Sequence, residues 1–367
     1  MAVEFSKPSF VRTLALILLA IGGLSATDLF LAKTEREANA AEAARYDREG
    51  ERLMQAGRSS EAADRFQSAL SLERDNEDYQ LALAQALDGA GRLEDAEKAL
   101  RALLERNSFS GPANLAMARV LVKQGHIDQA IAYYHRAIYG QWSDGQRSNP
   151  VRVRLELADL LSRRNSQEDL LAELLPLQDQ APEDAGTRLK MGKWFLAAGS
   201  PNRAASVFRT LLREQPELAE AYAGLGEAEF AQGNYRMARA EFQAALRLKP
   251  GDAYLSSRLE VCDLVLRLDP HRNGLSAEEE SERSRKLLEL AADAVKPCAG
   301  SAPEEPIADL LEAAAKQLKK RGSAPDNIEL AQRLWQTRKA VCGAAAAGAA
   351  RPGSDEALEL VMGKLSQ

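Results

Sequence analysis

A period of 34 residues governs the middle of the 367-residue chain and constrains its fold more than any other feature. Counted from Ala43, six blocks align, with one six-residue insertion, 145–150, between the third and the fourth. Position 8 of every block is Gly or Ala, and position 20 is Ala in all blocks but one. Such a period is typical of solenoids that stack one supersecondary unit. The blocks are 43–76, 77–110, 111–144, 151–184, 185–218 and 219–252.

The fixed positions of the block predict two helices joined by a turn. Small residues at positions 8 and 20 let the two helices approach closely beside a bulky residue at position 24. Position 15 is Gly in five blocks and Asn165 in the fourth, as expected where a helix ends in the left-handed conformation. Pro182, Pro216 and Pro250 mark the ends of the last three blocks, because the residue before proline disfavours helix. Position 24 holds Phe66, Leu100, Tyr134, Leu174, Phe208 and Phe242.

This pattern resembles the tetratricopeptide repeat family over residues 43–252. The resemblance implies an all-α fold, an α-solenoid of six helix-turn-helix repeats with a groove for a protein or peptide partner. The fourth block departs most, since Leu170 replaces the small residue and Asn165 replaces the glycine. We therefore expect a slight break in the superhelix at this block. Trp142, beside the insertion, either contacts a partner or covers the exposed edge of the third repeat.

Residues 253–270 keep helical spacing and are predicted to cap the stack, since a repeat array otherwise leaves an apolar face in water. Cys262 lies on the apolar face of this helix, which predicts a buried thiol. Cys298 and Cys342 follow predicted helices of the C-terminal helical region, so they either form a disulfide in an oxidising compartment or stay free thiols. That region, 271–367, is predicted to form helices near 276–296, 304–321, 326–342 and 355–365, with a linker at 343–354.

The N-terminal segment, 1–31, is predicted to be a membrane anchor or a signal. Residues 13–27 carry no charge, and with their apolar neighbours they approach the roughly 20 residues of a transmembrane helix. An uncleaved anchor, a cleaved signal peptide and a buried core helix are the three interpretations. Lys7 and Arg12 favour a cytoplasmic N-terminus. We therefore expect a single-pass protein of the cell (inner) membrane, with a polar helical stalk, 32–42, and the bulk of the chain extracytoplasmic or periplasmic.

Charge and composition exclude several classes of function. With 48 Lys and Arg against 54 Asp and Glu, the net charge is −6, which argues against a nucleic acid as partner. Apolar residues make up 45% of the chain, but aromatic residues make up only 5% of it. The apolar residues are therefore mostly Ala and Leu, which favour helix. Three His and three Cys show no metal-ligand spacing, so we expect no metal and no cofactor. The chain has no phosphate-binding loop and no catalytic motif, so we expect no enzymatic activity.

The family resemblance also assigns a groove. In tetratricopeptide repeats the first helix of each repeat lines the groove through positions 2, 5, 9, 12 and 13. In this chain those positions are acidic in the first and last repeats and basic in the middle ones. A basic stretch of this kind suits an acidic segment or a C-terminal carboxylate, although it can also balance neighbouring acids such as Asp159. The basic stretch consists of Arg119, Lys123, Arg152, Arg163 and Lys193.

Together these features predict a membrane-tethered extracytoplasmic scaffold or adaptor that binds partner segments in its groove. One alternative is an accessory protein or enzyme whose activity lies in residues 271–367. The other is a cleaved, soluble periplasmic binding protein. The Lys and Asn pattern of the chaperone-binding family members is missing, so chaperone ligands are not implied.

Overall fold

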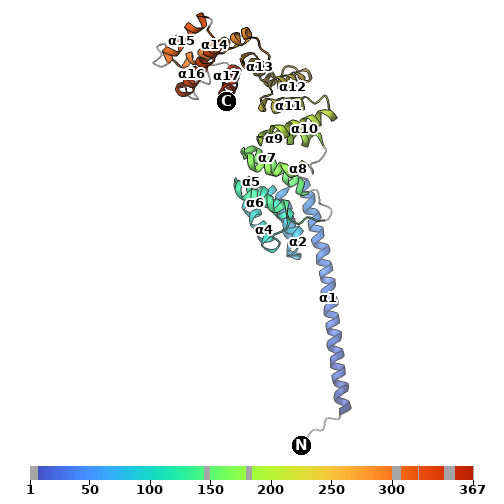
Figure 1. Cartoon of the computed structure of the whole chain (residues 1–367). Coiled ribbons are helices and arrows are strands. Elements are labelled where there is room, and N and C mark those ends of the chain that lie inside the picture. The colour runs from blue at the N-terminus through green and yellow to red at the C-terminus, as the bar shows by residue number, and fades with distance from the viewer. Residues whose placement is uncertain are drawn as a thin grey trace. The chain divides into compact units, whose positions relative to one another are not determined.

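The computed structural model describes residues 7–143, 149–178, 184–299, 307–320, 322–342 and 352–366. Within these ranges, the side chains of residues 7–13, 20, 22–28, 298–299, 341–342 and 352 lie outside the described part. The chain divides into two compact units, Met1–Leu157 and Ala158–Gln367, in which every regular element described is a helix (Figure 1).

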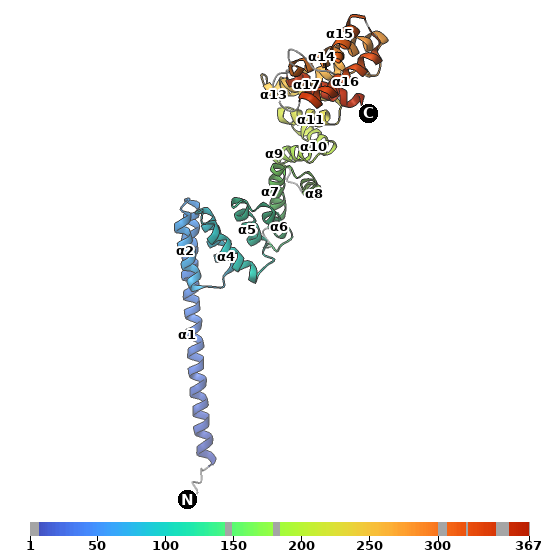
Figure 2. The ribbon, with the colours of Figure 1, turned by 90° about the vertical axis from the view of Figure 1, so that its left-hand side faces the viewer.

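The first unit consists of antiparallel helix pairs that correspond to the first three predicted repeats. Its first helix, α1 (Lys7–Gln55), contains 49 residues and runs without interruption from the N-terminal segment into the first repeat. Helix α2 folds back along the C-terminal end of α1 (Figure 2). The remaining helices are α2 (Ser59–Leu72), α3 (Glu77–Gly89), α4 (Leu93–Arg106), α5 (Gly111–Lys123) and α6 (Ile127–Ile138), and α7 (Asn149–Arg164) contains the division between the units.

The second unit holds the last repeats and the C-terminal helices. The helices predicted after residue 252 are confirmed, with two corrections at their ends. α17 begins at Pro352, so the last residues of the predicted linker belong to a helix, whose first turn tolerates proline. α14 continues to Ala299, so Cys298 lies within a helix and not after one. The helices are α8 (Gln167–Leu177), α9 (Ala185–Ala197), α10 (Pro201–Glu214), α11 (Ala219–Ala231), α12 (Tyr235–Leu248), α13 (Ala253–Leu268), α14 (Ala277–Ala299), α15 (Ile307–Lys320), α16 (Ala324–Cys342) and α17 (Pro352–Leu365).

The turn inside each repeat has the conformation that position 15 predicts. All six residues at this position have positive φ, from +57° at Asn165 to +81° at Gly125. In the first repeat the N–H of Arg58 donates to the carbonyl of Leu53 at 2.9 Å, and the other five turns repeat this bond. The bond satisfies a carbonyl at the helix end and fixes the reversal of the chain. Asn takes the place of Gly in the fourth repeat because its short polar side chain tolerates the left-handed region.

Close packing within each repeat follows a matched pair of positions. Wherever position 24 is Phe, position 8 is Gly, and wherever position 24 is Leu or Tyr, position 8 is Ala. The reason is steric, because a Cβ on Gly192 would lie 2.5 Å from the ring of Phe208. Gly50 and Gly226 face Phe66 and Phe242 in the same way, at 2.7 Å. All residues at positions 8, 20 and 24 are buried, which confirms the predicted core of the stack.

One buried cluster joins the last repeat to the C-terminal helices. It includes Phe242 of α12, Val261 of α13, Leu287 of α14 and Trp335 of α16, and it extends to Val361 of α17. The boundary predicted at 270–271 therefore does not coincide with a break in the core. The division between the units falls instead inside the fourth block, which departs most from the repeat pattern.

The cysteines differ in what the structure describes. Cys262 is buried and its thiol is free, as predicted. Burial raises the pKa of this thiol to about 12, so it stays protonated at neutral pH. The side chains of Cys298 and Cys342 lie outside the described part of the chain, so their pairing stays a prediction.

The N-terminal half of α1 exposes a series of large apolar side chains. Their exposed fractions range from 46% to 74%. Across the residues that the structure describes, no helix is long and apolar enough to pass through a membrane. Much of the predicted anchor has side chains outside the described part. The exposed apolar residues are Leu14, Leu16, Ile17, Leu18, Leu19, Ile21, Leu29, Phe30 and Leu31.

The matched packing predicts coupled substitutions. Gly192→Ala should lower the stability of the repeat stack by about 1–3 kcal/mol, because the new methyl group overlaps the ring of Phe208. Phe208→Leu alone should also destabilise, because it leaves a cavity. The double variant reproduces the native Ala158–Leu174 pair, so it should be more stable than the sum of the single changes. Urea unfolding of the four chains measures the coupling, and strictly additive changes would contradict the steric explanation.

Candidate functional site

A cleft opens on the first unit where three successive repeats meet the loop after α6. Its volume is about 410 Å³, within the range of ligand-binding clefts in proteins. The helices contribute residues from positions 2, 5 and 9 of their blocks, so side chains that recur on one helix face converge on one space. The helical lining includes Asp78, Leu81 and Gln85 of α3, Pro112, Leu115 and Arg119 of α5, and Arg152 of α7.

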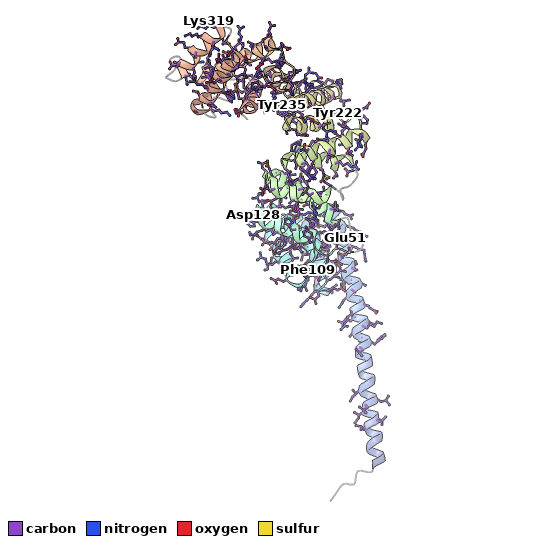
Figure 3. The ribbon with its side chains drawn as sticks, in the orientation of Figure 1. Glu51, Phe109, Asp128, Tyr222, Tyr235 and Lys319 are labelled. Atoms are coloured by element: carbon purple, nitrogen blue, oxygen red, sulfur yellow. The ribbon has the colours of Figure 1, made fainter. Side chains whose placement is uncertain are left out.

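The loop after α6 folds back on the segment before α5 and forms one wall of the cleft. The N–H of Gln141 donates to the carbonyl of Phe109 at 2.7 Å, and its carbonyl accepts from Gly111 N at 2.9 Å. Trp142 then lies against Gly111, where a Cβ would fall 2.4 Å from the indole Nε1. The indole N–H donates to the carbonyl of Ala137 at 2.9 Å. Trp142 therefore both covers the edge of the third repeat and lines the cleft, while Phe109 stays exposed (Figure 3).

Arg119 forms a bidentate ion pair with Glu156 of α7. Its Nε and Nη2 donate to the carboxylate at 2.9 and 2.7 Å, and Tyr134 Oη donates to the same carboxylate at 2.7 Å. Burial raises the pKa of Glu156, but the bonds from Arg119 and Tyr134 outweigh burial and hold this pKa below its usual value. Burial, together with the bond to Glu156, raises the pKa of Tyr134. The first half of α7 is thereby bound to both helices of the third repeat.

The five predicted groove cations differ in their surroundings. Besides Arg119, Lys123 has an acidic partner, Asp88, at 2.7 Å. Arg163 pairs with Asp159 on its own helix. Arg152 and Lys193 are exposed, and neither has a hydrogen bond or ion pair with a residue that the structure describes.

The cleft brings together only some of these cations. Arg119 and Arg152 both line it, whereas Lys123 lies on α5 outside the lining. Arg163 and Lys193 belong to the second unit, so the predicted basic stretch is divided between the two units.

Acidic side chains lie on the opposite side of the cleft. Asp78 of α3 lines it, next to Asp47, whose pKa is raised by burial and by the charges of Glu51 and Asp78. Arg119 and Arg152 line the side formed by α5 and α7. Asp78 on α3 and Arg152 on α7 therefore carry opposite charges across the cleft, while the charge of Arg119 is compensated by Glu156.

Two residues that shape the cleft were not predicted from sequence. Glu156 occupies position 6 of its block, outside the groove positions, and its partners lie 37 and 22 residues away in the chain. Gln141 lies just before the insertion and has no equivalent that forms such a bridge in the other repeats described. Only the density of charge at the start of α7 hints at Glu156. In the described part of the chain, no three His, Cys, Asp or Glu side chains gather into a possible metal site.

Comparison with known families identifies the repeats. Residues 53–110, 111–139 and 189–253 match models of the tetratricopeptide repeat. These matches fall on the helix pairs that share the turn and packing described above. The chain belongs to the tetratricopeptide repeat family, and its repeats form a scaffold for protein–protein interaction.

Known proteins with similar sequences or structures have low sequence identity to this chain. Cellulose synthase 1 operon protein C of Komagataeibacter xylinus is 24% identical over 182 residues, which make up 48% of this chain but only 14% of that protein. The solved structure of YrrB, a TPR protein with an unusual peptide-binding site, is 20% identical with a TM-score of 0.44, covering 53% of this chain and 96% of YrrB. The solved structure of the C-terminal part of a TPR repeat-containing protein from Cytophaga hutchinsonii is 14% identical with a TM-score of 0.47. The match covers 71% of this chain and 98% of that structure.

The ion pair at α7 predicts a pH-dependent loss of stability. A folded-state pKa below the unfolded value of about 4.3 stabilises the fold at neutral pH, and this contribution is lost as the pH falls through the folded value. Glu156→Gln should therefore destabilise the chain by about 1–3 kcal/mol at pH 7 and by much less near pH 3. Urea unfolding at both pH values measures the difference. The exposed Glu105→Gln is the matched control and should show little effect at either pH; an equal effect of Glu156→Gln at both would contradict the assignment.

Proposed function

We propose that the protein is a membrane-tethered scaffold whose first unit binds an acidic segment of a partner protein on the extracytoplasmic side of the membrane. The observation that carries the proposal is the position of Arg152 in the cleft. Its guanidinium is exposed, lines a concave space and has no hydrogen-bond or ion-pair partner among the described residues. A guanidinium offers donors in a fixed planar arrangement that matches a carboxylate, so it is suited to bind one.

The rest of the cleft supports recognition of an extended segment. The ion pair with Glu156 fixes the orientation of Arg119 beside Arg152, and it also compensates the charge of Arg119. Leu115 and Pro112 provide apolar surface next to these charges, and Trp142 provides a rigid aromatic wall. Polar side chains such as Gln85, Asn107 and Gln141 also line the cleft, so it offers hydrogen bonds as well as apolar contact to a bound segment. This function requires no catalytic step.

The membrane tether is supported by the N-terminal part of α1. Its apolar side chains are exposed over about two turns, from Leu14 to Ile21, and again from Leu29 to Leu31. Exposed apolar surface of this extent is costly in water and favourable in a lipid environment. Lys7 and Arg12 at the N-terminal end support a cytoplasmic N-terminus, which puts the repeats on the other side.

Reversal of the charge at Arg152 tests the cleft. Capture from detergent-solubilised membranes with the wild-type chain, followed by mass spectrometry, identifies the partner. Arg152→Glu should then weaken the affinity of the purified partner by roughly tenfold to a hundredfold, because a charge-assisted bond is replaced by repulsion. Lys98→Glu, an exposed change of the same charge on α4, is the control, and equal binding by all variants would refute the cleft as the site.

Extraction of membranes with carbonate tests the tether. The wild-type chain should stay in the pellet, and Leu16→Asp with Leu19→Asp should release it, since an acid at the centre of a span costs about 2.5–3.5 kcal/mol. Ala38→Asp with Ala41→Asp, in the exposed polar stretch of α1, is the control and should leave the protein in the pellet. Release of the wild-type chain, or a mature N-terminus beyond residue 26, would favour the soluble alternative.

Protease added to spheroplasts should degrade the repeats if they are extracytoplasmic.

A further inference from the structure

Helix α13 continues the repeat register as the first helix of a seventh unit. With Ala253 at position 1, the groove positions 9 and 13 are occupied by Val261 and Val265. Both are buried, with 0% and 3% of their surface exposed. Position 9 is polar in all six preceding repeats, from Glu51 to Glu227. The C-terminal half of the groove face of α13 is therefore apolar and covered by another element, whereas Tyr254 and Ser257, at positions 2 and 5, are exposed.

The covering element is α17, the last helix of the chain. Its residues Ala357, Leu358, Val361 and Met362 are buried and belong to the same cluster as Val261 and Val265. The spacing i, i+1, i+4 and i+5 places these four side chains on one face of the helix. At its start, the Cβ position of Gly353 lies 3.6 Å from Val261 Cγ2. α17 thus lies along the groove face of α13.

Acidic side chains fix α17 in this position. Asp355 pairs with Arg338 of α16, and both side chains are largely buried. Glu359 accepts from the indole N–H of Trp335 at 2.9 Å and pairs with Lys339. At the other end of the helix the charges are reversed: α17 provides the base, Lys364, which pairs with Asp269 after α13. The charges of α17 are thus complementary to those of the helices beside it.

Arg258 connects α17 to the groove of the sixth repeat. Its Nη1 donates to Glu356 of α17 at 2.6 Å, and its Nε and Nη2 donate to Glu227 at 2.8 and 3.0 Å. Its guanidinium also lies 3.7 Å from the ring centre of Phe230. Glu227 occupies groove position 9 of the sixth repeat, so the groove line of the repeats leads directly to α17.

We propose that α17 is an intramolecular ligand of the groove face of α13, and that this face accepts from a partner an amphipathic helix with the same pattern. That pattern has acids at i, i+1 and i+4 and apolar residues at i+2, i+3, i+6 and i+7, as in 355–362. Binding of a helix along a complementary apolar groove is a common mode of recognition. Because α17 is part of the chain, it competes at an effective concentration in the millimolar range. This proposal concerns the second unit and does not rest on the proposed function of the first.

A labelled peptide of residues 352–365, added to the full-length chain, tests the proposal. Leu358→Asp with Val361→Asp places charges in the interface and should release α17 while it remains part of the chain. The peptide should bind this variant at least about tenfold more tightly than it binds the wild type, in which α17 occupies the groove. Fluorescence anisotropy measures both affinities. Equal binding to the two chains would overturn the proposal.

A charge exchange tests the geometry. In the released chain, Arg338→Glu should weaken peptide binding, and the peptide with Asp355→Arg should restore it. Lys319→Glu, an exposed change on α15, is the matched control and should have no effect (Figure 3). Hydrogen exchange provides the second measurement, and α13 and α14 should remain protected when α17 is released. Loss of their protection together with that of α17 would show a permanent core element and overturn the proposal.

Discussion

The fit between position 8 and position 24 is the interaction on which the repeats depend. A ring of the size of Phe208 fills the space that the missing side chain of Gly192 leaves, so the two helices of the pair pack at close distance. Each pair then presents the same face in the same direction, and residues at positions 2, 5 and 9 of neighbouring pairs converge. The cleft of the first unit exists because of this regularity, although none of the packing residues touches it.

The cleft also depends on two contacts that are irregular. The bridge at Gln141 directs the chain back toward the start of α5, so Trp142 closes one side of the space. Glu156 binds Arg119 and Tyr134, so the beginning of α7 packs with the third repeat although the helix continues into the second unit. The fourth block thus takes part in both units, and its unusual Asn165 and Leu170 occur where the repeat pattern is least regular.

Local and periodic features of the fold could be predicted, because they depend on neighbouring residues or on residue types that recur at fixed positions of each block. The positive φ at Gly57 and its equivalents and the helices after residue 252 needed no knowledge of distant contacts. The partners of Glu156 and the docking of α17 could not be predicted, since they join segments that share no period. Two further contacts show the same limit: Gln80 and Asn114, at position 4 of their blocks, donate to carbonyls of the preceding loop at 2.7 and 3.0 Å.

The continuity of α1 has a geometric consequence for the first repeat. One helix contains both the exposed apolar segment and the residues that pack against α2, with no turn or proline between them from residue 9 to Gln55. Each residue of an α-helix adds a rise of about 1.5 Å and a rotation of about 100°. Two extra residues in 32–42 would therefore point the repeats almost to the opposite side of the helix axis, whereas seven would nearly restore the original direction. The length of this short polar segment sets the azimuth of the cleft around α1.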